Sequence, residues 1–383
     1  MVNFGYDVEC LPVSDEVSVE YGLKYANNEV CYPATLVIGD LIKALADGDH
    51  DPKKTALAMV QTGGQCRASN YLPLIKKAVV DAGFTDTPVI SVAFGSGLKN
   101  DQPGFKINWL KAIPVIVYTL LYSDCISKMY YAAAAREKSR GEAMRLKEKY
   151  LQKGESALKS GKWKVLLKSV SEAAQEFDAI CIEKECHKVG VVGEIYLKFN
   201  PFAHRNVVDW LMEQGVEIAP PILTDFFTQF FVNSRTNKYA LTEKNIIPDF
   251  VYNALYGLLK KIICKFEGAA AGFRYFTPFN DIFEESEEAS EIINLSTQFG
   301  EGWLLPGEIV AYHRNGVKNV ISLQPFGCIA NHIVERGIEN RLKKHLPQLN
   351  LLSLDFDSGV SDVNIKNRLL LFIDKLKENT DGK

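Results

Sequence analysis

The sequence has 383 residues, of which 47% are apolar and 24% charged, and its formal net charge at pH 7 is −3. These values are ordinary for a globular protein and exclude an intrinsically disordered chain, while the length favours two or three domains. The near-neutral charge and the absence of a long basic block argue against nucleic-acid binding.

The chain carries no signal peptide pattern, because Met1 to Asp7 lacks a basic region followed by an apolar one. Its most apolar stretch, Ile113 to Tyr122, is too short to span a bilayer. Its eight cysteines are more typical of thiols or metal ligands than of disulfides in a chain of this size. We therefore expect a cytoplasmic protein that does not enter a membrane.

The first part of the chain alternates strands and helices, which predicts a parallel, doubly wound sheet. Strands are predicted at 7–13, 55–61 and 88–94, and helices at 14–27, 34–46 and 71–82. Ser14 is the predicted N-cap of the first helix, and Gly83 ends the third. We assign residues 1–107 to a first α/β domain. Asn3-Phe4-Gly5-Tyr6 is similar to the end of a helix, so we expect this domain to lack its opening strand and helix.

A helical pattern occupies residues 108–187, with one apolar helix at 115–135 followed by a charged, solvated helical region. A second α/β domain is predicted for residues 188–383. Its strands are expected at 189–195, 216–219, 320–323 and 351–356, and its helices at 203–214, within 223–315, and at 338–346 and 362–377. The predicted fold is α/β, with two flavodoxin- or Rossmann-like parallel-sheet domains facing a cleft and a helical insertion between them.

Three cysteines stand where an apolar or turn segment meets a helical pattern. Cys31 lies two residues before Pro33, Cys66 follows Gly63-Gly64-Gln65, and Cys328 follows Pro325-Phe326-Gly327. In an open α/β sheet, such junctions line the cleft at the carboxyl ends of the strands. We therefore expect the three thiols to meet. Three thiolates with an open fourth position favour an iron–sulfur cluster or a catalytic metal over a closed structural zinc site.

The other cysteines and polar groups give weaker signals. Cys10, Cys125 and Cys264 lie in apolar surroundings and are expected to be core residues. Glu194, at the end of a predicted strand, and His332, four residues after Cys328, are candidate catalytic residues, although each could instead cap a helix. A polar stripe from Asp357 to Arg368 either caps the last helix or faces the cleft. The sequence has no Walker A motif, so electrons that depend on ATP would have to come from another protein.

Five segments together resemble the 2-hydroxyacyl-CoA dehydratase superfamily, which includes the benzoyl-CoA reductase subunits and the double-cubane cluster reductases. The segments are Asn27 to Ala34, Gln61 to Tyr71, Val192 to Tyr196, Gln324 to Cys328 and Asp357 to Asn364. They occur in the order that the superfamily has and span nearly the whole chain. The closest similarity is to the C-terminal part of large acyl-CoA dehydratase activase proteins.

The resemblance implies a 4Fe–4S cluster held by Cys31, Cys66 and Cys328 between flavodoxin-like domains. A double-cubane cluster is less favoured, because the shared segments supply only three thiolates. The resemblance also implies an ATP-dependent iron–sulfur activator as partner, and a homo- or heterodimer with a homologous subunit. The implied activity is radical dehydration or reduction of an acyl-CoA or another small substrate, with electrons of low potential.

Three alternatives to this activity stay open at the level of the sequence. The chain could be a non-catalytic electron-transfer or scaffold subunit that pairs with a catalytic homologue. It could be a substrate-binding or metal-storage module without redox chemistry. It could also be a zinc enzyme.

Overall fold

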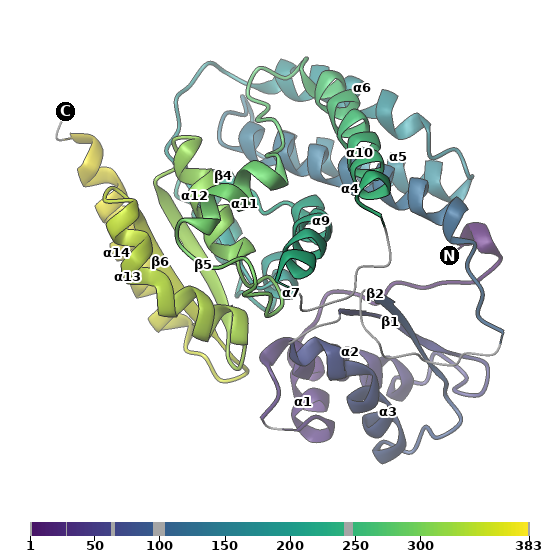
Figure 1. Ribbon diagram of the computed structural model, residues 1–383. Coiled ribbons are helices and arrows are strands. Elements are labelled where there is room, and N and C mark those ends of the chain that lie inside the picture. The colour runs from purple at the N-terminus through teal and green to yellow at the C-terminus, as the bar shows by residue number, and fades with distance from the viewer. Residues whose placement is uncertain (1, 28, 63–65, 95–103, 241–247, 382–383) are drawn as a thin grey trace.

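The computed structural model describes residues 2–27, 29–62, 66–94, 104–240 and 248–381 (Figure 1). The strands are β1 (Leu57–Thr62), β2 (Val89–Phe94), β3 (Lys188–Gly193), β4 (Glu217–Ala219), β5 (Asn319–Pro325) and β6 (Asn350–Phe356). The helices are α1 (Glu16–Tyr25), α2 (Tyr32–Ala46), α3 (Tyr71–Asp81), α4 (Trp109–Ala134), α5 (Glu142–Lys159), α6 (Val165–Ile180), α7 (Ile195–Phe199), α8 (Val207–Glu213), α9 (Leu223–Tyr239), α10 (Asp249–Ala270), α11 (Ile282–Ser290), α12 (Leu304–Arg314), α13 (Arg336–His345) and α14 (Asp362–Asp381). Short helical turns cover Val2–Phe4, Arg67–Asn70 and Ala330–Glu335.

Two parallel sheets confirm the predicted α/β class. In the first, β1 pairs with β2, with Leu57 opposite Val89 and Thr62 opposite Phe94. The second has the order β4-β3-β5-β6, and all of its pairings are parallel. Because the strands of a parallel sheet point the same way, the segments that follow β3, β5 and β6 leave from one edge.

Three helices, α4, α5 and α6, lie between the two sheets in chain order, within the residues 108–187 for which a helical pattern was predicted. α4, α5 and α6 pack together with α10, and their contact buries Phe177 and Phe266 completely. Within the described ranges, α4 is the one helix whose length and composition would let it cross a membrane. With 26 residues it is longer than the apolar stretch Ile113 to Tyr122 that the sequence analysis considered too short for a span. A single helix of this kind is weak evidence for a span, and α4 contributes to a core shared with three other helices.

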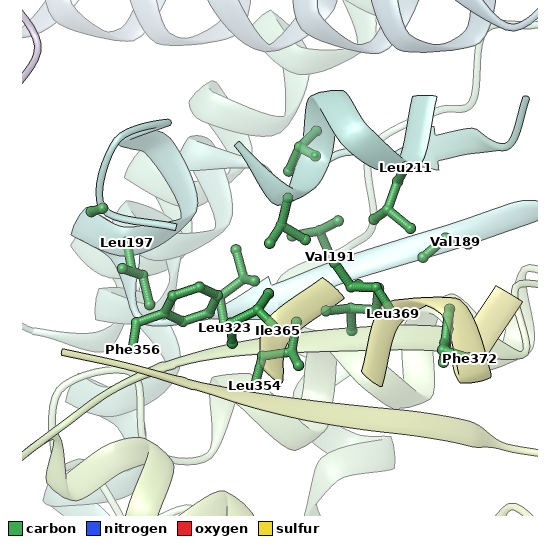
Figure 2. Packing of buried hydrophobic residues seen from close by; sticks show 14 of the residues in the cluster. Val189, Val191, Leu197, Leu211, Leu323, Leu354, Phe356, Ile365, Leu369 and Phe372 are labelled. Carbon is green, nitrogen blue, oxygen red and sulfur yellow. The ribbon is translucent and has the colours of Figure 1, made fainter. Parts of the chain in front are cut away.

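The largest core lies around the second sheet and extends to the first part of the chain. Figure 2 shows Val191, Leu323 and Leu354 of the strands packed against Ile365 and Leu369 of α14. The same buried cluster includes side chains from α1 and α2, among them Val19, Tyr32 and Leu36. The two α/β parts therefore share buried apolar surface, which is the main source of stability in a protein interior.

Two predictions for the first part of the chain are wrong in detail. Residues 7–13 form no strand, since no described strand pairs with them and all seven are exposed or half-buried. The N-cap of α1 is Asp15 rather than Ser14, because Asp15 accepts a hydrogen bond from the Ser18 amide and completes a capping box. Ser14 instead donates to Asp40 Oδ2 at 2.8 Å and lies 3.0 Å from the Tyr196 hydroxyl.

In the second part of the chain, the end of one predicted strand and the start of one predicted helix differ from the structure. The strand predicted to run to Ile195 stops at Gly193, whose φ of +129° is unfavourable for residues with a side chain. Glu194 then caps α7 by accepting a hydrogen bond from the Leu197 amide. The helix predicted from Ala203 begins at Val207, because the preceding residues form turns and Asn206 has a left-handed conformation.

α1 and α2 cross at two glycines, which allows their backbones to touch. A Cβ atom on Gly39 would lie 1.8 Å from the Ser18 carbonyl oxygen, and one on Gly22 would lie 2.2 Å from the Thr35 carbonyl oxygen. A backbone oxygen cannot move aside as a flexible side chain can. The contact therefore fixes the position of α2, whose first residue follows Cys31.

We predict that Gly39→Ala lowers the free energy of unfolding by about 1–3 kcal/mol or more, because the added methyl group overpacks the helix crossing. Gly257→Ala in α10 is the control, since a Cβ there meets no atom within 4 Å. That variant should be neutral or more stable by up to about 1 kcal/mol, as alanine is preferred in helices. Urea denaturation measures both. Equal stability of the two variants would contradict the close crossing.

Candidate functional site

Each of the three predicted cysteines begins a helical segment. Cys31 is the N-cap of α2, where Pro33 occupies one of the first two helical positions. Cys66 is the N-cap of the turn Arg67–Asn70, and its sulfur accepts from the Ala68 amide at 3.4 Å. Cys328 follows β5 and precedes the turn Ala330–Glu335. The segment Gly63 to Gln65, which joins β1 to Cys66, lies outside the described residues.

The structure brings these three segments together. Gly327 has a φ of +78°, and a Cβ on it would lie 3.2 Å from Cys31 Cα. Next to it, the Tyr32 amide donates to the Phe326 carbonyl at 3.1 Å. A Cβ on Gly300 would lie 3.6 Å from Cys66 Sγ and 3.9 Å from the Cβ of Ala330, two residues after Cys328. The segments of Cys31 and Cys66, from the first sheet's part of the chain, therefore lie next to the segments around Cys328 in the second.

All three thiols are desolvated, and the charges around them are mostly negative. Cys31 and Cys328 are 6% and 9% exposed. Burial raises the pKa of Cys66 to about 12, with smaller contributions from the charges of Glu301, Cys31 and Glu194. Burial likewise raises the pKa of Cys31 and of Cys328, and Glu194 acts on both. Without a metal ion the thiols stay protonated at neutral pH, and metal binding would release protons.

Two carboxyl groups act on these thiols through their charge. We use the name cysteine cleft, after the cleft predicted from the sequence, for Cys31, Cys66 and Cys328 with Glu194 and Glu301. Glu194 is half-buried, and burial with the nearby charge of Glu301 raises the pKa of Glu194 to about 8. Glu301 is 4% exposed, and its Oε1 accepts from the Ile195 amide at 2.7 Å. Glu194 therefore carries a proton near neutral pH.

Behind the carboxyl groups the interior holds further charges. Lys198, one turn after Glu194 on α7, donates to Glu308 Oε1 at 3.0 Å and Oε2 at 3.2 Å, and the pair is almost completely buried. Burial lowers the pKa of Lys198, but the charges of Glu308 and Glu301 outweigh it and hold the amine protonated. Glu308 also borders a cavity of about 70 Å³, together with Asp225 and Lys128.

Tyr71 is the nearest partner of a cysteine sulfur. Its hydroxyl lies 3.2 Å from Cys31 Sγ, and either atom could donate. In a loaded site, a hydroxyl at this position would donate a hydrogen bond to the thiolate, which is one of the means by which proteins tune iron–sulfur clusters. The residue belongs to the segment Gln61 to Tyr71, but the sequence alone assigned it no role.

His332 does not join this group. Its Nε2 lies 3.6 Å from Asp355 Oδ1 at the end of β6, and its ring packs edge-on against Phe326. Of the expected core cysteines, Cys125 is fully buried, whereas Cys10 and Cys264 are exposed, so the prediction is wrong for those two. Val8 and Leu11 beside Cys10 are exposed as well, whereas Ile262 and Ile263 beside Cys264 pack against the helical core while Cys264 itself is exposed.

Sequence reasoning missed Glu301, Lys198 and Glu308. Glu301 lies between Gly300 and Gly302, which both have positive φ angles, and two glycines around an acid were a usable signal of a tight loop. Lys198 and Glu308 carried no such signal. Their pairing depends on how α7 packs against α12, which no local pattern predicts.

Three cysteine thiols are a donor set that iron–sulfur clusters use. Within the part of the chain that the structure describes, no three Cys, His, Asp or Glu side chains are close enough to hold one metal ion. The cysteines of a cubane each bind a different iron, so a cluster here would need the sulfurs of Cys31, Cys66 and Cys328 to stand further apart than the ligands of one ion.

No protein-family model matches the chain, and no curated protein matches it significantly. The function therefore has to be inferred from the residues of the cysteine cleft and from the resemblance of the five segments.

We predict that the metal-free wild-type protein loses stability relative to Glu194→Gln as the pH rises. The pKa of Glu194 is about 8 in the folded protein against an ordinary value of 4.5, so between these pH values the folded state binds more protons than the unfolded state. The contribution of Glu194 protonation to the free energy of unfolding is complete below pH 4.5. It is lost as the pH rises through 8, and the free energy of unfolding falls by no more than about 1.4 kcal/mol per pH unit. Urea denaturation of both proteins from pH 5 to 9 measures this difference. If the free energies of unfolding of the wild type and Glu194→Gln change with pH in parallel, the raised pKa of Glu194 is contradicted.

Proposed function

We propose that this protein is a cytoplasmic iron–sulfur enzyme of the 2-hydroxyacyl-CoA dehydratase type. It would use electrons of low potential from an ATP-dependent activator to dehydrate or reduce an acyl-CoA or a similar small substrate. The observation that carries the proposal is that the segments of Cys31, Cys66 and Cys328, from both halves of the chain, lie next to one another, and that the charges of Glu194 and Glu301 act on their thiols.

The topology of the second sheet supports the proposal. Numbered within its own part of the chain, the order β4-β3-β5-β6 reads 2-1-3-4, which corresponds to the flavodoxin-like order without its last strand. In such sheets ligands bind where the strand order reverses, here between the ends of β3 and β5. Glu194 follows β3, and Cys328 follows β5. The two candidate residues thus stand at the place where this fold binds ligands.

In the proposed enzyme, Cys31, Cys66 and Cys328 would hold a 4Fe–4S cluster, which supplies single electrons of low potential when bound. Glu194 would donate the proton with which the hydroxyl group of the substrate leaves as water. A protonated carboxyl group with a pKa near the working pH suits this role. Glu301 would keep Glu194 protonated through its charge, and Lys198 would balance the negative charge behind them.

The electron source would be a separate protein. The sequence has no Walker A motif, so ATP hydrolysis would take place on an iron–sulfur activator that docks against this chain. The resemblance also leads us to propose a homo- or heterodimer with a homologous subunit.

We predict about four iron and four sulfide ions per chain after purification without oxygen, and loss of most of both in Cys66→Ser. Iron and sulfide analysis with absorption spectroscopy measures the content. Cys264→Ser is the matched control, because that thiol is exposed on α10, and it should leave the content unchanged. A zinc-loaded protein that keeps its metal in Cys66→Ser would exclude the proposal.

We also predict that the isolated protein does not hydrolyse ATP and that turnover of acyl-CoA esters requires an added activator. In Glu194→Gln, turnover should fall by about 100-fold or more, the contribution that a general acid typically makes, while the iron content stays at the wild-type level. Product analysis by mass spectrometry follows the reaction. A fully loaded protein that transfers electrons to a homologous subunit, but transforms no ester itself, would be the electron-transfer subunit instead.

A further inference from the structure

The cavity of about 70 Å³ that Glu308 borders lies apart from the cysteine cleft. Side chains of α4, α9, α12 and β4 line it, together with Lys188 and Val317. Lys188 begins β3 and Val317 precedes β5, whereas Glu194 and Cys328 follow these strands at the other edge of the sheet. The side chain of Lys188 is 40% exposed, so the cavity reaches the surface at that residue.

Five charged side chains line this cavity, and three of them already have partners of opposite charge. Glu217 forms ion pairs with Arg136 at 2.7 Å and with Lys188 at 3.3 Å. Glu308 is paired with Lys198, as described for the interior behind the cysteine cleft. These three lining groups therefore need no further partner.

The other two charged groups, Asp225 of α9 and Lys128 of α4, carry opposite charges and form no ion pair with each other. Asp225 is only 5% exposed, yet its side-chain carboxyl group has no hydrogen bond or ion pair within the described part of the chain. Lys128 is half-buried and donates to the Pro278 carbonyl at 3.2 Å. One acid and one amine thus line the same cavity without meeting.

Both groups would gain from a charged partner. Burial raises the pKa of Asp225 to about 8, and the charges of Glu308 and Asp124 add to this effect, while those of Lys128 and Lys198 oppose it. Burial also lowers the pKa of Lys128. Because a nearby opposite charge favours the charged form of each group, a ligand with an ammonium group and a carboxylate would stabilise both.

The size of the cavity restricts this ligand further. The volume admits about five to seven water molecules, and so a ligand with a similar number of non-hydrogen atoms. A simple cation would meet the charge of Lys128, and a simple anion would meet that of Asp225. We propose that this cavity binds a small α-amino acid, with its ammonium group on Asp225 and its carboxylate on Lys128. Glycine and alanine are of the required size, whereas phenylalanine is too large.

Isothermal titration calorimetry of the full-length protein with glycine and L-alanine tests the site. L-Alanine should bind at least about 10-fold more tightly than propionate, which lacks the ammonium group, or ethylammonium, which lacks the carboxylate. This factor is the typical contribution of one hydrogen bond to a charged group. L-Phenylalanine should not bind.

Two variants separate the roles of the charged groups. Asp225→Asn should weaken the binding of L-alanine by about 10- to 100-fold and remove its advantage over propionate. Lys128→Met should remove the advantage of L-alanine over ethylammonium. Asp374→Asn is the matched control, because that carboxylate is exposed on α14 and does not line the cavity, and it should bind as the wild type does.

Absence of glycine and L-alanine binding to the wild-type protein would overturn the inference, as would unchanged binding of L-alanine in both Asp225→Asn and Lys128→Met. Equal binding of L-phenylalanine would place the ligand outside this cavity and would also overturn it. If Asp225→Asn fails to fold, Lys128→Met decides alone. The cavity shares no residue with the cysteine cleft, so neither result bears on the proposed iron–sulfur function.

Discussion

The close backbone contact between the two halves of the chain is the constraint on which the site depends. The Tyr32 amide donates to the Phe326 carbonyl, and Gly327 lies against Cys31, where a Cβ would be only 3.2 Å from Cys31 Cα. Because main-chain atoms make this contact, the spacing of Cys31 and Cys328 does not vary with side-chain rotamers. The shared core around Tyr32 keeps the halves together. The crossing of α1 and α2 at Gly22 and Gly39 fixes the position of α2, and with it the position of Cys31 at the start of α2.

The same packing explains the electrostatics of the cysteine cleft. Desolvation is the largest influence on the pKa of each thiol and of Glu194, so the cleft without metal favours neutral groups. A cationic cluster at the proposed site would reverse that preference, because its charge would compensate several thiolates at once. Lys198 is paired with Glu308, whereas the charge of Arg67 opposes the effect of burial on the pKa of Cys31.

Much of the sheet architecture could be predicted from the sequence, because its strands are buried apolar runs ended by glycine or proline. The predicted strands at 55–61, 88–94, 216–219 and 351–356 lie within a few residues of β1, β2, β4 and β6. Residues 7–13 show the limit of such reasoning, since an apolar run becomes a strand only beside a partner. Cys66 and Cys328 come after β1 and β5, as their strand-end positions in the sequence predicted, whereas Cys31 lies between two helices, α1 and α2, with no strand directly before it. The places of Glu301 and Tyr71 could not be predicted, because they depend on tertiary packing of distant segments.

Because the cysteines of the cleft come from two halves of the chain, they become available at different times during synthesis of the protein. Cys31 and Cys66 leave the ribosome early, whereas Cys328 lies near the end of the chain and emerges only after the helical layer and most of the second sheet have been made. Until then, the early thiols have no third partner and no covering wall from Gly300 and Ala330. A nascent or truncated chain would therefore expose two thiols to oxygen or to stray metal ions. Insertion of a cluster bound by all three cysteines would therefore have to follow synthesis of Cys328.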